Sequence, residues 1–306
     1  MKNKMKNYFH NLKNAEVFQS QKLLLTLSLK MLLVVILMFM NDNGYLSIFI
    51  PVIAIPGILF RKVRENKYYW LSLTIFASTF YLVLDLFGYV PNHKHIFAYL
   101  IIAVTIAMFL KDKNNPLLFL QNQSKIIIGL CFLFASIGKF LAPEFLNGSF
   151  FEFTNSSDPR FFGFTSLIGN VDVTLLKQNE TNLNSLVNTI STTKTYLLNG
   201  TEKIHQFGLI ISYWTIFIES LIAISFCLPK RFKLSKYRNI FLVVFILTTY
   251  PIATVTGFAI ILTLMGFIQS LDYESKPTNY SLFYLLVFIL LPLNYFPFTR
   301  LLELFY

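Results

Sequence analysis

Long apolar runs, separated by short polar or basic segments, constrain the fold of this chain more than any other feature. About 20 consecutive apolar residues are enough to carry one helix across the hydrocarbon core of a bilayer. Only 13% of the residues are charged, whereas a soluble domain carries roughly 25%. We therefore expect an all-α, polytopic membrane protein that crosses the cytoplasmic (inner) membrane several times.

Eight apolar runs are candidate membrane spans. They cover Leu23–Met40, Tyr45–Phe60, Tyr69–Val90, Ile96–Leu110, Ile126–Ala142, Phe207–Leu228, residues 239–269 and Tyr280–Pro297. The run 239–269 has 31 residues, with Pro251 and Gly257 near its middle. Two short helices or a broken helix fit such a run better than one span. The sequence therefore predicts eight or nine transmembrane helices in a single domain covering residues 1–306.

Basic residues gather in alternate loops, and this pattern predicts the orientation. Segment 1–22 holds five lysines, loop 61–67 holds four basic residues and loop 229–238 holds five, whereas segment 143–204 holds four in 62 positions. Basic loops stay on the cytoplasmic side, so we expect a cytoplasmic N-terminus and an extracytoplasmic segment 143–204. The same pattern explains the net charge of +11, and we expect the lipid bilayer, not nucleic acid, as the partner.

The segment 143–204 is rich in Asn, Ser and Thr, which indicates a loosely packed loop. Its apolar part, from Phe150 to Ile168, could fold back on the membrane surface.

Lys139 is the most unusual residue of the fifth run. Residues 126–138 are apolar except for Ser136, and Pro143 should end the helix at about Ala142. A lysine at this depth can extend its amine to water, or it can face the bundle interior as a partly desolvated amine. Both readings remain open from the sequence.

Other polar groups also stand out in the apolar runs. Topology places Asn92 and His93 at the outer level of Lys139, so these three residues could share an outer-leaflet site. Glu219 lies 12 residues into the sixth run, where a carboxylate has either a structural partner or a function. Asp85, nearer an outer end, has the same two readings.

Motifs for common catalytic or metal sites do not occur in the sequence. There is no H-x-E, C-x-x-C, G-x-S-x-G or phosphate-binding glycine loop, and His93 with His95 provide too few ligands for a metal. We therefore expect no metal. Cys131 and Cys227 both lie inside apolar runs, which argues against a disulfide framework.

The order of these residues resembles the HTTM superfamily, whose best-known type is the vitamin K-dependent gamma-glutamyl carboxylase. Lys139, followed by Phe145 and Gly148, is similar to the lysine-bearing span of that family. Asp85 followed by Asn92-His93, Glu219 within IFIESLIAISF, and the last span 282–296 with Pro292 are similar to further segments. Where many relatives carry a histidine in the seventh span, this chain has Tyr250, a third polar residue predicted within the membrane beside Asp85 and Glu219.

The resemblance implies Lys139 as a proton-abstracting base with Asn92 and His93 nearby, carboxylase-like chemistry coupled to a lipid quinol, and a secreted peptide as substrate. Residues 148–163 also resemble the sporulation-delaying protein B type, which is similar in size and belongs to an antimicrobial-peptide system. GLCFLFASIGKFLAP resembles the opening span of the quinone-linked DoxX/MauE type. Enzymatic maturation of a secreted peptide is the first hypothesis. A non-catalytic accessory for peptide export or maturation and a DoxX/MauE-like protein are the alternatives.

The loop-charge pattern predicts the outcome of a topology experiment. A reporter fused after Lys125 or Arg231 should be cytoplasmic, and a reporter inserted near Asn184 should be external, because basic loops remain inside. Alkaline phosphatase and fluorescent-protein activities measure the two locations, and an external signal at Arg231 would refute the orientation.

Overall fold

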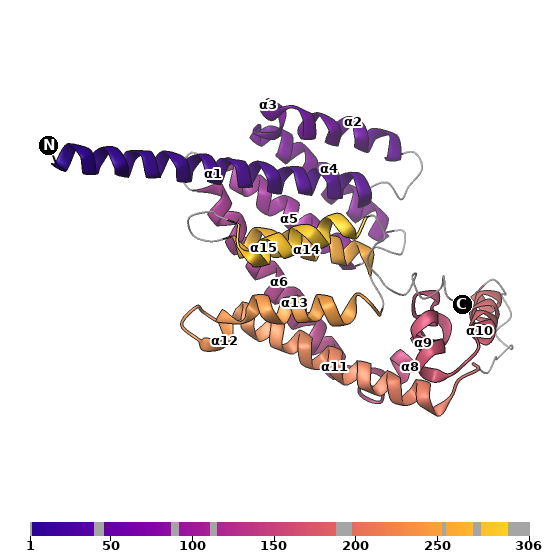
Figure 1. Ribbon diagram of the computed structural model, residues 1–306. Helices are drawn as coiled ribbons and strands as arrows, with labels where there is room; N and C mark the ends of the chain where they lie inside the picture. The colour runs from indigo at the N-terminus through magenta and orange to yellow at the C-terminus, as the bar shows by residue number, and fades with distance from the viewer. Residues whose placement is uncertain are drawn as a thin grey trace. The chain divides into compact units, whose positions relative to one another are not determined.

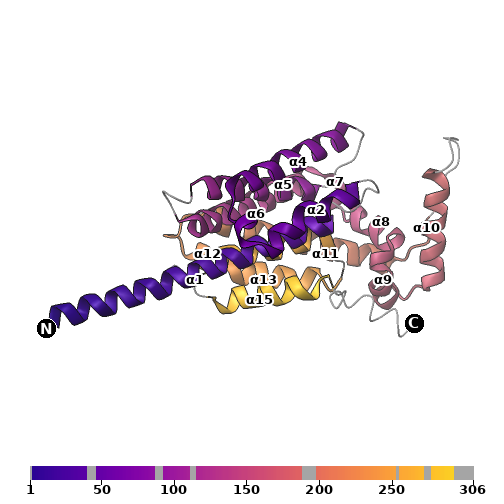
Figure 2. The same cartoon turned by 90° about the horizontal axis from the view of Figure 1, so that it is seen from above.

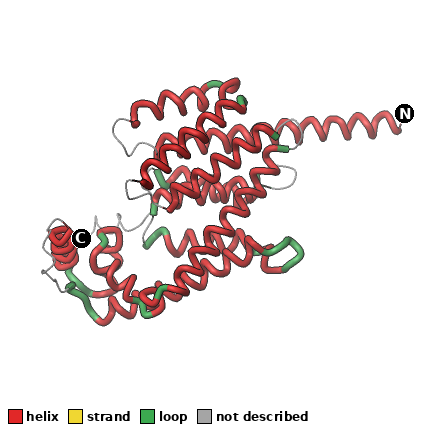
Figure 3. The backbone as a smooth tube through the Cα atoms, turned by 180° about the vertical axis from the view of Figure 1, so that it is seen from behind, coloured by secondary structure: helices red, strands yellow, loops and turns green. Residues whose placement is uncertain are grey.

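The fold is seen in a computed structural model that describes residues 2–39, 46–86, 92–110, 115–187, 198–252, 255–271 and 277–292. Within these ranges the chain forms helices joined by loops and turns, without a strand (Figure 3). The all-α prediction is therefore confirmed. The chain divides into two compact units, which are described separately: residues 1–128 with 256–289, and residues 129–255 with 290–306.

The first unit is built around α14 (Thr256–Ser270), which packs against α1 (Lys2–Phe39) and α5 (Asn92–Phe109). Every residue of α14 from Ala259 to Ser270 is buried. A helix that is apolar on all sides belongs in the interior of a bundle. The remaining helices of this unit are α2 (Leu46–Leu59), α3 (Arg61–Arg64), α4 (Lys67–Leu86), the first half of α6 (Pro116–Leu141) and α15 (Asn279–Leu290).

Helices α4 and α5 lie side by side, as two views show (Figures 1 and 2). The turn before α4 is fixed by Arg64, which is buried and donates hydrogen bonds of 2.9 Å to the carbonyls of Gly57 and Ile58. Those carbonyls end α2 and have no partner within their own helix. The carbonyl of Arg64 in turn accepts a bond of 2.8 Å from the indole of Trp70.

The second unit is organised along α11 (Glu202–Cys227), which packs against α8 (Ser149–Ser157), α9 (Phe162–Gly169) and α13 (Arg238–Thr249). The second half of α6 also belongs to this unit. Its short elements are α7 (Pro143–Leu146), the 3-10 turn η2 (Pro159–Phe161) and α12 (Lys233–Lys236), and its remaining helix is α10 (Val173–Val187).

Three described helices are long and apolar enough to cross a membrane, within residues 20–38, 116–141 and 202–227. Five shorter apolar helices accompany them. The structure therefore supports the membrane-protein class, and the number of eight or nine spans stays a prediction. As predicted, α6 ends directly before Pro143, and the run 239–269 is interrupted between Thr249 and Thr256.

The prediction of a loosely packed loop at 143–204 is wrong for most of that segment. Residues 149–187 form a helical cap, composed of α8, η2, α9 and α10. An apolar cluster in this cap joins it to α11 and consists of Phe162, Val171, Leu176 and Ile204. Asn179, fully buried, donates bonds of 2.9 Å to the carbonyls of Ser156 and Asn199, and accepts one of 2.8 Å from the amide of Asn199.

Replacing Asn179 by Ala should loosen the cap, because it removes a hydrogen-bond partner from the buried carbonyl of Ser156 and from the partly buried backbone groups of Asn199. Each such group costs about 1–3 kcal/mol. Limited proteolysis of the purified protein should cut the cap of the variant faster. Gln178→Ala, at the exposed neighbouring position, is the control and should leave the rate unchanged. Equal rates for both variants would contradict the role of Asn179.

Candidate functional site

An ion pair joins Lys139 on α6 to Glu219 on α11 within the second unit. The Lys139 Nζ donates to the Glu219 Oε2, and the side chains are only 17% and 9% exposed. Both helices are candidate membrane spans. The two charges therefore lie together in an apolar setting, where unpaired charges are costly and usually mark a functional or structural site.

The pair is one of several contacts between α11 and the consecutive helices α6, α7 and α8, which run antiparallel to it. From one contact to the next, the residue number rises in α6 to α8 and falls in α11. In this order the contacts are Gly129 with Cys227, Lys139 with Glu219, Leu146 with Tyr213, and Glu152 with His205. The Tyr213 hydroxyl donates to the Leu146 carbonyl at 3.1 Å, and the His205 Nδ1 lies 2.6 Å from the Glu152 Oε2.

Glycines bring the backbones of this packing close together. A Cβ at Gly208 would lie 2.9 Å from the Glu152 amide nitrogen, and one at Gly129 would lie 3.0 Å from the Cys227 Sγ. Small residues permit such approach between helices. Gly148 adopts a φ of 78° where the chain passes from α7 to α8, a left-handed conformation that favours glycine.

An aromatic ring lies close to Lys139, and buried serine hydroxyls occur on both helices of the pair. The Lys139 Nζ lies 5.6 Å from the centroid of the Phe145 ring, within range of a cation–π interaction. Ser136 lies one turn before Lys139 on α6, and Ser212 lies two turns before Glu219 on α11. Both are buried, and neither hydroxyl has a hydrogen-bond partner among the described residues. Such hydroxyls are available to water or to a polar group of a ligand.

The pair restricts the chemistry of Lys139. To act as a base, the Lys139 amine must first give up a proton. Glu219 is positioned to take that proton. Together, the two residues can hold and relay one proton between two apolar helices.

The structure thus brings together two residues that sequence reasoning selected separately, Lys139 and Glu219. Asn92 and His93 belong to the first unit, so their predicted site with Lys139 stays a prediction. The His93 imidazole lies against Gly257, where an added Cβ would meet its Nε2 at 2.5 Å. The side chains of Asp85 and Asn92 lie outside the described part of the structure.

Tyr250 lies at the end of α13, 2% exposed, with its ring edge-on to Phe245 at 5.9 Å. Sequence reasoning missed the pair of Glu152 and His205. These residues are 53 positions apart, and no local pattern connects them. Among the residues described, no group of three or more His, Cys, Asp or Glu side chains could hold a metal ion.

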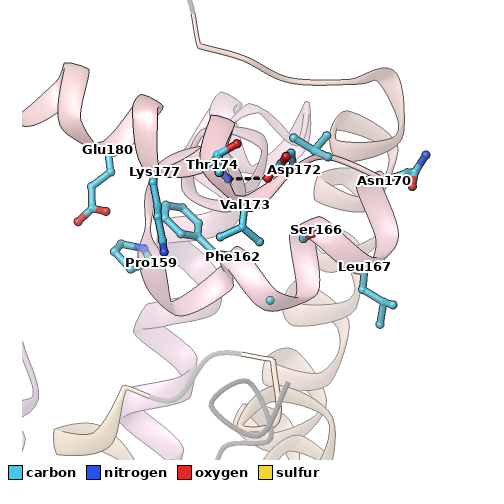
Figure 4. A pocket seen from close by; sticks show the side chains of 12 residues that line it. Pro159, Phe162, Ser166, Leu167, Asn170, Asp172, Val173, Thr174, Lys177 and Glu180 are labelled. Atoms are coloured by element: carbon cyan, nitrogen blue, oxygen red, sulfur yellow. Dashed lines mark hydrogen bonds between the residues drawn. The ribbon is translucent and has the colours of Figure 1, made fainter. Parts of the chain in front are cut away.

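The cap carries a half-open cavity of about 880 Å³ between η2, α9 and α10. In Figure 4 the side chains of Phe162 and Lys177 lie beside Pro159, and the amide of Thr174 donates to the Asp172 carboxylate. The cavity is lined by charged residues of both signs and includes neither Lys139 nor Glu219. We therefore take the Lys139–Glu219 pair as the candidate site.

Removing one member of the ion pair should destabilise the protein more than removing both. Glu219→Gln leaves the ammonium without its counter-charge, and breaking a buried pair in this way costs about 3–5 kcal/mol. The double variant Lys139→Met, Glu219→Leu should recover much of this loss. Thermal unfolding in detergent measures both, and Lys203→Met, at an exposed position of α11, is the control. Equal stability of Glu219→Gln and the native protein would show that the charges are not coupled.

The chain matches no family model, and searches of curated proteins and of solved structures find no similar protein.

Proposed function

We propose that this chain is an HTTM-type protein of the cytoplasmic (inner) membrane that modifies or matures a small secreted peptide at the outer leaflet. In this proposal it has eight or nine transmembrane helices and a cytoplasmic N-terminus. The three long apolar helices, the loop-charge pattern and the order of Asp85, Asn92-His93, Lys139 and Glu219 support it.

The ion pair of Lys139 and Glu219 is the observation that carries the catalytic part of the proposal. The proton of the ammonium passes to the Glu219 carboxylate, which leaves a neutral amine at Lys139. That amine then abstracts a proton from the peptide substrate. General base catalysis of this kind requires a positioned group whose protonation state can change near neutral pH.

A lipid quinol is the cofactor that the resemblance implies. Ser136, which is buried one turn before Lys139 on α6, could hydrogen-bond to the substrate. Asn92 and His93 remain the further residues proposed for the site.

A non-catalytic accessory function is the second candidate, because the same pair also holds two helices together. The contacts from Gly129 to Glu152 form a continuous packing along α11, as expected of a structural clamp. In this case the protein would assist export or maturation of an antimicrobial peptide without changing its covalent structure. The DoxX/MauE-like reading rests on the α6 sequence alone.

Lys139→Arg separates the two candidates. A guanidinium keeps the charge and can pair with Glu219, but it stays protonated. Catalysis should therefore fall by about 100-fold or more, while membrane insertion stays intact. The measurement is mass spectrometry of a candidate small secreted peptide after co-expression with each variant.

Lys203→Arg serves as the matched control and should leave the peptide's mass and yield as in the native protein. If the Lys139→Arg variant supports full maturation, the proton-transfer mechanism is rejected and the accessory function remains. A peptide whose mass is the same with and without the native protein would also reject an enzymatic modification.

A further inference from the structure

Helix α8 has its polar and apolar faces reversed relative to those of a helix on a water-soluble protein. Asn155 and Ser156 are 0% and 2% exposed, whereas Phe150 and Phe153 are 39% and 51% exposed. Phe150 and Phe153 are three residues apart on α8 and therefore lie on one face of that helix. Leu146, at the end of the preceding helix α7, is also exposed, and these three residues are here called the phenylalanine face (Leu146, Phe150 and Phe153).

Residues on the other side of α8 make its contacts with the rest of the second unit. Glu152 meets His205 and Gly208 of α11. The carbonyl of Asn155 accepts a bond of 3.0 Å from Thr165, and the carbonyl of Ser156 accepts from Asn179. The protein thus buries Asn155 and Ser156 of α8 and leaves Phe150 and Phe153 exposed, while the Glu152 side chain stays 42% exposed.

Within the phenylalanine face, the ring of Phe150 packs against aromatic neighbours. The rings of Phe145 and Phe150 stack with their centroids 4.2 Å apart, and Phe151 stands edge-on to Phe150 at 5.2 Å. Exposed aromatic rings favour a partner, because removing large apolar side chains from water is favourable.

Continuity with neighbouring helices identifies that partner as lipid. An exposed apolar row on α6, containing Phe134, Ile137 and Leu141, ends two residues before α7 begins. On the other side, the carbonyl of Leu146 accepts a bond from Tyr213. Tyr213 belongs to a second exposed row, on α11, together with Ile210 and Phe217. A helix that crosses a bilayer turns such a row toward the acyl chains, so lipid-facing surfaces lie on both sides of the phenylalanine face.

We propose that the phenylalanine face lies in the bilayer interface and anchors the helical cap to the membrane beside the end of α6. Aromatic residues prefer this zone, where apolar rings meet headgroups. The inference uses only the crossing of the membrane by α6 and α11. It does not depend on peptide maturation, and its test contains no peptide.

An environment-sensitive NBD label tests the depth of the face in the full-length protein. The background carries Cys131→Ala and Cys227→Ala, and Phe153→Cys introduces the labelling site. The protein is reconstituted into phosphatidylcholine–phosphatidylglycerol vesicles containing spin-labelled lipids with a shallow or a deep nitroxide. We expect blue-shifted NBD emission that the shallow nitroxide quenches more strongly than the deep one.

Gln178→Cys, exposed on α10, is the matched control and should show water-like emission without quenching. Leu146→Cys provides a second probe of the same face, so that misfolding of one variant does not decide the result. Folding of each variant is checked by its protease pattern against the unlabelled protein. Water-like emission at both Leu146→Cys and Phe153→Cys overturns the proposal. Blue-shifted emission that neither nitroxide quenches also overturns it, because protein would then cover the face.

Discussion

The interaction on which the second unit depends is the ion pair between Lys139 and Glu219. In an apolar medium an ammonium and a carboxylate attract each other over several ångströms, and neither finds another way to offset its loss of water. The pair therefore fixes the register of α6 on α11. A slip of one residue would turn α11 by about 100° and move it about 1.5 Å along its axis, which would separate the charges and the glycine contacts together. The close approach at Gly129 and Gly208 follows from this register.

Much of the helical architecture could be predicted because apolar length and helix-breaking residues are local properties. Pro143 follows the end of α6, and Pro251 follows the end of α13 within the run 239–269, as expected because proline is disfavoured in a helix interior. Lys139 and Glu219 could also be selected one by one, as charges in apolar runs. Their pairing could not, because hydropathy and topology place a residue at a depth without its angular position around the helix. That is why sequence reasoning grouped Lys139 with Asn92 and His93, and left Glu219 without a named partner.

The helical cap shows a second limit of sequence reasoning. Its Asn, Ser and Thr content indicated a loose loop, since such residues are common in solvated segments. In the structure, Asn179 and Thr165 are buried and satisfy backbone groups of other segments. Composition does not distinguish a polar side chain that faces water from one that replaces water for a buried carbonyl. For the apolar part from Phe150 to Ile168, the sequence suggested a place at the membrane surface but did not show which face of α8 is buried.

The burial of α14 on every side has a consequence for the assembly of the membrane protein. A span with a lipid-facing stripe can enter the bilayer by itself and find its neighbours later. Helix α14 offers no such stripe between Ala259 and Ser270, and it rises only about 22 Å over its 15 residues. Its neighbours α1 and α5 precede it in the chain and leave the ribosome first. They are therefore available when α14 emerges, and the insertion of α14 is coupled to tertiary packing against them.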